Sequence, residues 1–352
     1  MNGIRYSGKK AAFAFLAVLI IILAVAGAIY ILERVGKESE AQLVIISYTS
    51  FSEWGLGPWA EEEFEELYDI NVTIDTNYGD VGQVINAIDK GGVDADLVIG
   101  IDNSMLRTAV ELDLLDTYRP GNIDRVDPGL IFDPQYRVIP YDYGYIAIIC
   151  NSEMMDERGL PYPGSVMDLA DNVYRDQLML LDPTMSSTGS SFLIWAASVA
   201  GEQLDAYLED LSENAYNVFQ SWDIMYNAFM EGEAPMAISY GLDTASEIQY
   251  YGETDTVTVV PEEEGYRQIE GAGILKGARN RENAELFLEF MLSDQFQSRV
   301  GYNVMLPVVP TVEVDEVYME HGEFAEQHVE PGQDTIMESY DEWLSSWESA
   351  FY

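Results

Sequence analysis

QLVIISYTS, residues 42–50, is a short apolar run that ends in small polar residues, which is typical of a buried β-strand. Two similar runs follow it, NVTIDTN at 71–77 and DADLVIGID at 94–102. Helical patterns lie between and after these runs, at 59–68, 79–89 and 104–115. Strands that alternate with helices over short connections predict a parallel sheet covered by helices.

A second α/β unit follows a long aromatic strand, VIPYDYGYIAIICN, at 138–151. It has a strand and helix around LMLLDPTMSSTG, a helix at 221–230, the strand APMAISYG, more strand within 256–278 and a helix at 281–296. The last segment, 337–352, has an aromatic stripe at helical spacing and predicts a helix packed on the body. Two such units predict a ligand site at their junction, because open α/β sheets bind ligands beyond the carboxyl ends of their strands.

The first forty residues differ from the rest. Residues 11–32, AAFAFLAVLIIILAVAGAIYIL, contain no charge in twenty-two positions, and Arg5, Lys9 and Lys10 precede them. At 1.5 Å per residue this run spans the ~30 Å hydrocarbon core of a bilayer. The positive-inside rule assigns residues 1–10 to the cytoplasm and everything after Leu32 to the outside. We therefore expect a single-pass membrane protein whose binding domain is extracellular or periplasmic.

A cleavable signal peptide is the alternative for this segment, since Ala24-Val25-Ala26 resembles a signal peptidase site. An uncleaved anchor is favoured because the apolar run continues past that point, and residues 33–41 then form a polar tether. Cys150, the one cysteine, lies in an apolar run, so we expect no disulfide and no lipid attachment.

The charge balance is strongly acidic. Sixty-two acidic and seventeen basic residues give a formal net charge of −45, which excludes nucleic acid as a partner because phosphate binding needs a basic surface. A solvated acidic coat suited to saline surroundings is one interpretation, and attraction of a cationic solute is another. The two interpretations are compatible.

The sequence lacks the signatures of an enzyme. Its two histidines, His321 and His328, have no metal-ligand pattern, and Cys150 is in the wrong setting for a nucleophile. There is no phosphate-binding glycine loop and no Gly-x-Ser-x-Gly elbow. We expect a binding protein without catalytic activity, metal or cofactor.

Several collinear motifs carry a family resemblance. They are SYTSFSEWGLGP (47–58), ADLVIGIDN (95–103), VIPYDYGY (138–145), LDPTMSSTG (181–189), QSWDIMYNAFMEGEAPMAISY (220–240) and the closing EWLSSW. With them the chain resembles the thiamine-binding subunits of ABC importers, a branch of the group that also includes iron(III) and polyamine binders.

This resemblance implies an α/β, two-lobed type II periplasmic-binding-protein fold. The implied organisation is lobe 1 at 42–142, lobe 2 at 143–265, and a return to lobe 1 with C-terminal helices at 266–352. It further implies that the loaded protein, as a monomer, docks on an ABC permease with its own ATPase subunit. The transported ligand would be a small cation, thiamine or a thiamine phosphate.

The resemblance also implies site residues. Asp80 would face the aminopyrimidine, Ser186 and Ser187 would hold phosphate at a helix start, and Trp222 and Tyr240 would wall the site. Two positions depart from the family pattern, where Ser246 and Val304 replace aromatic residues and Tyr302 is a stand-in for the latter. Independently, a cation with an aromatic ring favours aromatic faces and carboxylates. That chemistry adds further candidates in loops at strand ends: Tyr48, Asp102, Tyr143 and Asp243.

Other functions stay open at this point. Iron(III) binders of the same group use adjacent tyrosines, which suit the metal because phenolates are hard oxygen ligands. Tyr250-Tyr251 is such a pair. A polyamine would also suit the acidity. An alternative from a different functional class is the membrane-anchored ectodomain of a sensory receptor.

Overall fold

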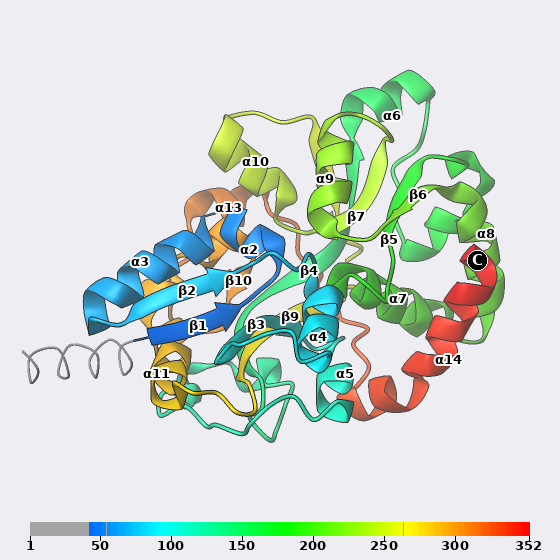
Figure 1. The fold of residues 1–352 in the computed structure, drawn as a ribbon. Helices are drawn as coiled ribbons and strands as arrows, with labels where there is room; N and C mark the ends of the chain where they lie inside the picture. Colours follow the sequence, from blue (N-terminus) through cyan, green and yellow to red (C-terminus); the bar gives the residue numbers. More distant parts are fainter. Residues whose placement is uncertain (1–41, 54, 263) are drawn as a thin grey trace, which may run out of the picture.

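The computed structural model describes residues 42–53, 55–262 and 264–352. These residues form two α/β lobes that share one continuous sheet (Figure 1).

The first lobe is built from the first part of the described chain together with a later segment that begins at β9. Its strands are β1 (Gln42–Ile46), β2 (Asn71–Asp75), β3 (Leu97–Asp102), the first half of β4 (Ile139–Asn151), β9 (Arg267–Ile274) and β10 (Leu306–Pro307). Its helices are α2 (Thr49–Glu53), α3 (Leu56–Tyr68), α4 (Val81–Asp89), α5 (Leu106–Glu111), α11 (Arg281–Met291) and α12 (Asp294–Gln297), with short 3-10 turns η1 (Ile123–Arg125), η2 (Pro128–Leu130) and η6 (Val300–Asn303). β1 lies parallel to both β2 and β3, which confirms the parallel pairing predicted for the first three strands.

The second lobe comes from the middle of the chain. Its strands are the second half of β4, β5 (Leu178–Leu181), β6 (Ala215–Phe219), β7 (Met236–Tyr240) and β8 (Thr256–Val259). Its helices are α6 (Ser152–Arg158), α7 (Ser187–Ala200), α8 (Leu204–Asn214), α9 (Trp222–Met230) and α10 (Asp243–Tyr251), with 3-10 turns η3 (Val166–Ala170), η4 (Asn172–Tyr174) and η5 (Gly201–Gln203). β5 is parallel to β6 and β7, so this lobe repeats the α/β plan of the first.

Strand β4 connects the two lobes. Residues Ile139 to Tyr145 pair with β9 in lobe 1, and from Ile146 to Cys150 the same strand pairs with β7 in lobe 2. The strand order across the described sheet is β2-β1-β3-β9-β4-β7-β5-β6, with β8 and β10 also paired to β4. The division expected between residues 142 and 143 thus falls inside this shared strand, just before its change of partner.

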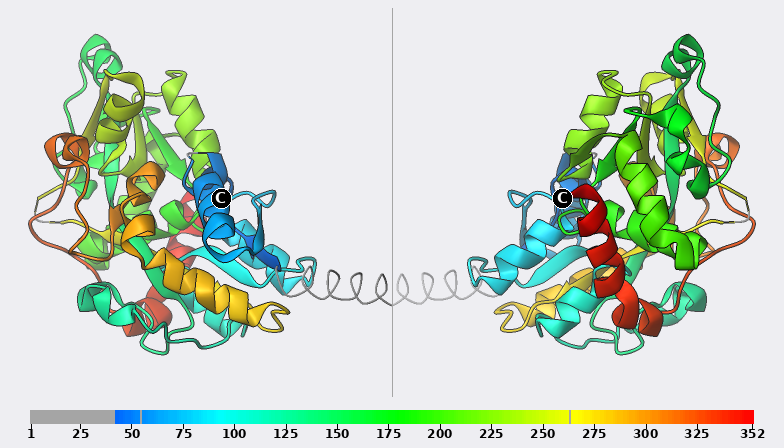
Figure 2. Two further views of the ribbon diagram at one scale, coloured as in Figure 1. Left: turned by 90° about the vertical axis from the view of Figure 1, so that its left-hand side faces the viewer. Right: turned by 90° about the vertical axis from the view of Figure 1, so that its right-hand side faces the viewer.

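Each lobe has its own hydrophobic core. One core contains β1 to β3 with α3, α4 and α11, and the other contains β5 and β7 with α7 to α9. The C-terminal helix α14 (Gln333–Phe351) places Ile336, Tyr340 and Trp347 in the second of these cores, and it runs alongside α8 (Figure 2). The preceding helix, α13 (Glu316–His321), contacts α10 of the same lobe. The chain therefore ends on lobe 2 after rebuilding lobe 1.

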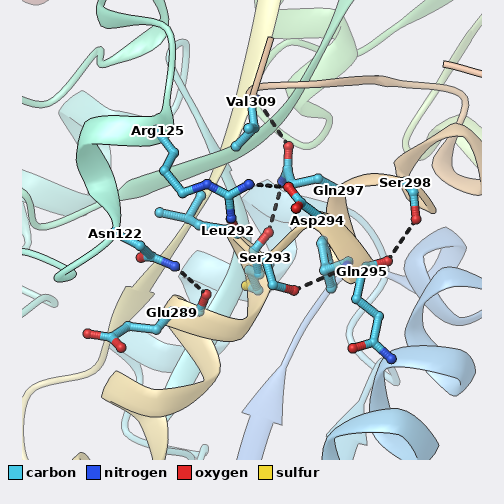
Figure 3. Close-up of polar contacts among 12 residues, drawn as sticks. Asn122, Arg125, Glu289, Leu292, Ser293, Asp294, Gln295, Gln297, Ser298 and Val309 are labelled. Atoms are coloured by element: carbon cyan, nitrogen blue, oxygen red, sulfur yellow. Dashed lines mark hydrogen bonds and ion pairs between the residues drawn. The ribbon is translucent and has the colours of Figure 1, made fainter. Parts of the chain in front are cut away.

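The helix predicted over 281–296 is divided in two, and Figure 3 shows the contacts at the break. Ser293 caps the second piece, since its hydroxyl accepts from the backbone N–H of Phe296 at 3.2 Å. Arg125 donates to the carbonyl oxygen of Leu292 at 2.9 Å, and Asn122 donates to that of Glu289 at 2.8 Å. These side chains add donors to carbonyls at the end of α11, where the Leu292 N–H also reaches Glu289, so capping contacts hold the break.

No helix in the described ranges 42–53, 55–262 and 264–352 is both long enough and apolar enough to span a membrane. The anchor expected at 11–32 lies outside the described residues.

Candidate ligand-binding cleft

A pocket lies where the two lobes meet, beside the ends of several of their strands. Its lining comes from both lobes: Tyr48, Ser50, Asp80, Val81, Ser187, Thr188, Trp222, Tyr240, Glu270, Asn303, Val304 and Met305. Its enclosed part has room for a few water molecules only.

Asp80 is both a helix cap and a wall of the cleft. It is the N-cap of α4, with a reciprocal capping bond from its own N–H to Gln83, and its Oδ1 accepts from Val81 at 2.6 Å. Its Oδ2 accepts from the backbone N–H of Trp222 in the other lobe at 3.3 Å. Burial raises the pKa of Asp80, and hydrogen bonds, including one from Ser186, lower it less. The side chain thus links the lobes while keeping an acidic group at the cleft.

Aromatic rings form the lobe 2 side of the cleft. Trp222 stacks on Tyr226 with ring centres 4.6 Å apart, and Tyr240 tilts toward it at 6.1 Å. The indole N–H of Trp222 donates to Ser239 at 2.9 Å, and the Tyr240 hydroxyl bonds Thr188 at 2.7 Å. These bonds hold the two rings in fixed orientations, so they present preformed faces to the cleft.

The N-terminus of α7 opens toward the same space. Ser186 is its N-cap and is fully buried, whereas the next two residues, Ser187 and Thr188, line the cleft. A Cβ on Gly189 would lie 2.6 Å from the carbonyl oxygen of Leu181, so the close packing of this helix start on β5 requires glycine. The unpaired N–H groups and dipole of a helix start favour negative charge nearby.

Glu270 forms the floor of the cleft on strand β9. Its Oε2 accepts from the hydroxyls of Tyr48 at 2.7 Å and Tyr141 at 2.6 Å, and its exposed fraction is 3%. Asn303 donates both to the Tyr48 oxygen and to Asp142, a second buried carboxyl beside Glu270. Burial raises the pKa of Glu270 to about 7 although both tyrosines lower it.

Glu270, Asn303 and Thr188 are cleft residues that the sequence-based prediction missed. The one available signal was Glu270 in RQIEGAGI, an acid in the middle of an apolar strand. Such a residue pays a large desolvation cost, so its presence indicates a partner or a function.

The cleft brings together five of the residues predicted for the site: Tyr48, Asp80, Ser187, Trp222 and Tyr240. The other predicted residues do not line it. Ser186 lies directly behind, as the α7 cap. Asp102 caps its own turn, accepting from Ser104 and Met105. Asp243 accepts from the N–H of Tyr240 at 2.9 Å.

Tyr143 and Tyr302 also lie away from this pocket. Tyr143 pairs with Leu306 of β10 and lines a separate, largely apolar pocket. The hydroxyl of Tyr302 accepts from Arg299 at 2.8 Å, and its neighbour Asn303 reaches the cleft instead. Tyr250 and Tyr251 are on α10 with exposed fractions of 41% and 63%, and neither lines the cleft.

The charged residues that line the cleft are all acidic. Two of its lining residues, Asp80 and Glu270, are acidic, and none of the lining residues within the described chain is basic. The nearest arginine along β9, Arg267, is paired with Glu330. Carboxylates beside aromatic faces are complementary to a cation that carries an aromatic ring.

Known proteins resemble this chain in sequence and in fold. The profile of the family described as "Bacterial extracellular solute-binding protein" matches residues 55–298. A thiamine-binding periplasmic protein of Brucella abortus is 31% identical over 78% of this chain and 81% of its own length. One of Haemophilus influenzae is 26% identical over 89% of this chain and 93% of its own length.

Solved structures share the two-lobed arrangement. A periplasmic thiamin binding protein has a TM-score of 0.81 at 25% identity, covering 88% of this chain and 96% of that one. The apo ferric ion-binding protein A of Pasteurella haemolytica has a TM-score of 0.71 at 20% identity, covering 88% of this chain and 98% of that one, and supports the fold alone. The α/β, two-lobed fold predicted from the sequence is therefore confirmed, and the chain belongs to the family of bacterial extracellular solute-binding proteins.

Proposed function

We propose that this protein captures thiamine, or a thiamine phosphate, between its lobes and delivers it to the permease and ATPase of an ABC importer. The observation that carries the proposal is the lining of the cleft, where three aromatic rings and two carboxylates converge and none of the described lining residues is basic. The names of the relatives from Brucella and Haemophilus support the same ligand. Reversible binding, without a catalytic step or a cofactor, is the proposed activity.

The parts of the ligand suit different walls of the cleft. We assign the aminopyrimidine to Asp80, whose carboxylate can accept from an exocyclic amine in a charge-assisted bond. The thiazolium ring carries the positive charge, and the faces of Trp222 and Tyr240 with the nearby Glu270 carboxylate would stabilise it. Tyr48 closes the opposite side.

A phosphorylated ligand would use the start of α7. Ser187 and Thr188 line the cleft at this helix N-terminus, and backbone N–H groups there favour an anion. We propose Ser187 as the contact, with Ser186 holding the turn through its bond from Gly189.

Iron(III) is the alternative within the same class. Its binding would need several hard oxygen ligands converging on one point. The adjacent pair Tyr250 and Tyr251 is outside the cleft, on α10, so it does not supply them there. A polyamine would find the carboxylates but would make less use of the stacked rings.

We also propose that residues 11–32 span the membrane and hold the binding domain at its outer face, close to the permease. The support is the uncharged run of twenty-two residues with basic residues before it. The binding domain would then be a monomer at the end of a short tether.

Titration calorimetry of residues 41–352 tests the proposed ligand. We expect heat and 1:1 binding with thiamine, and no binding with chelated iron(III) or spermidine at the same concentrations. If thiamine shows no binding at concentrations below millimolar, in the salt that the protein requires, the proposal is contradicted. Tight iron(III) binding would support the alternative.

Two substitutions of Asp80 separate its capping role from its binding role. Asn caps helices as well as Asp does, so Asp80→Asn should leave the melting temperature nearly unchanged, whereas Asp80→Ala should lose about 0.5–2 kcal/mol of stability. Both should weaken thiamine binding roughly 10- to 150-fold, the equivalent of a hydrogen bond to a charged group. Calorimetry and thermal melts measure the two effects. If Asp80→Asn binds thiamine with unchanged affinity, Asp80 acts only as a helix cap and does not contact the ligand.

Trp222→Ala removes a ring from the cleft. A lost cation–π contact of ~0.5–2 kcal/mol should weaken thiamine binding roughly 2- to 30-fold. Phe229→Ala is the matched control, because Phe229 is buried on the same helix but does not line the cleft. The control should lower stability and preserve affinity. Equal affinities for the two variants would count against the assignment of Trp222.

Fractionation of cells that produce the full chain tests the anchor. We expect the protein in the membrane fraction after washes that strip peripheral proteins, and residues 41–352 alone in the soluble fraction. N-terminal sequencing of the mature protein provides the control. A soluble protein that begins near residue 27 would show that the segment is a cleaved signal peptide.

A further inference from the structure

Three carboxyl groups lie in a row across three neighbouring strands beneath the cleft. Glu270 of β9 is in register with Asp102 of β3 on one side and with Asp142 of β4 on the other. Their exposed fractions are 3%, 0% and 0%. We call these three residues the carboxyl row. Residues directly opposite each other on paired strands share a face, so the acids are close neighbours.

The hydrogen-bond donors around the carboxyl row are unevenly distributed. Glu270 accepts from two tyrosine hydroxyls on Oε2 and from Gln268 on Oε1, and Asp102 Oδ1 accepts from Ser104 and Met105. Asp142 accepts from Asn303 on Oδ2 at 3.0 Å. Asp142 Oδ1 and Asp102 Oδ2 are buried and have no hydrogen-bond partner among the described residues. A buried anionic oxygen without a donor is costly, and like charges side by side add to the cost.

The groups that face the carboxyl row do not supply positive charge. From the elements packed around it, the titratable side chains that interact with it are Tyr48, Asp80, Tyr141, Tyr240, Tyr266 and Tyr340. All are neutral or acidic. Arg267, on the same strand as Glu270, is engaged with Glu330 in a bidentate pair. The positive charge that would balance the row is therefore left to a ligand in the cleft.

We propose that the carboxyl row holds a proton while the cleft is empty and releases it to solvent when a cationic ligand binds. The step is an exchange, in which a neutral carboxylic acid loses its proton and the resulting carboxylate is balanced by the bound cation. No bond of the ligand changes. Only the identity of the cation rests on the proposed function.

The ionisation of the individual groups agrees with this exchange. Burial raises the pKa of Glu270 to about 7 and that of Asp102 to about 8, and burial followed by repulsion from Glu270 raises the pKa of Asp142. The row is thus partly protonated near neutral pH. The cation binds the deprotonated row better than the protonated one. The affinity for the cation must therefore rise with pH until the pH reaches these pKa values, and it must level off above them.

Calorimetry with thiamine in buffers of different ionisation enthalpy measures the released proton. At pH 6 to 7 we expect the observed heat to depend on the buffer, with about one proton released per ligand. The affinity should rise about tenfold per pH unit below pH 6.5 and become constant above pH 8.

Three variants assign the effect to the row. Glu270→Gln should bind more weakly and should lose most of the proton release. Asp142→Asn keeps the acceptor for Asn303 but removes a repelling charge, so the rise in affinity should move to lower pH. Asp80→Asn, which removes a carboxylate outside the row, should weaken binding and keep the proton release, but at a lower pH, because Asp80 repels Glu270 and raises its pKa. The titration of the ligand's own aminopyrimidine cancels in these comparisons.

A measurement without ligand tests the stored proton directly. A Glu270 pKa raised above its unfolded value means that the folded wild type loses stability as pH rises from about 4.5 to about 7. The melting temperature of wild type relative to Glu270→Gln should therefore fall between pH 5 and pH 8. A difference that stays constant over this range would overturn the inference, whatever the ligand is.

The calorimetry separates the two proposals. Thiamine that binds with buffer-independent heat and pH-independent affinity would refute the proton exchange and leave the proposed function intact. A failure of thiamine to bind, together with the pH-dependent melting difference, would refute the proposed ligand and leave the protonated row established.

Discussion

The change of partner within strand β4 is the constraint on which the rest of the structure depends. One continuous strand pairs with β9 in lobe 1 through Tyr145 and with β7 in lobe 2 from Ile146. The two hydrophobic cores are therefore separate, yet the lobes are joined by the backbone hydrogen bonds of one sheet. The cleft lies at this junction, where side chains from both lobes converge.

The electrostatics of the cleft follow from the same strands. β9 carries Glu270 and β4 carries Asp142, and their cross-strand register brings two acids together in a buried place. Tyrosine hydroxyls from Tyr48 and Tyr141 offset part of the desolvation cost, but no described side chain neutralises it. This differs from the surface, where the large acidic excess is solvated and screened. The buried acids are thus the ones that indicate what the protein binds.

Much of the fold was accessible from sequence. The alternation of strands and helices predicted both α/β lobes, and most predicted elements agree with observed ones to within a few residues. The predicted helix over 281–296 failed at Ser293, because Arg125 and Asn122, distant in sequence, satisfy the carbonyls at the break. The helix predicted over 104–115 is shorter, since Asp102 accepts from the backbone of Ser104 and Met105 and delays its start to Leu106. Both errors are at helix ends, where side-chain caps decide the boundary.

The sequence by itself determined the two-lobed class and the family, because hydrophobic periodicity and collinear motifs are local properties of the chain. Which residues line the cleft was decided by the tertiary structure. Asp102 and Asp243, which end or follow strands as expected of site residues, turn inward to cap their own backbones, whereas Glu270 and Asn303 reach the ligand space from segments without a motif. Which side chain faces a cleft depends on strand register and on the angle between lobes, and these arise only when residues more than a hundred positions apart are brought together.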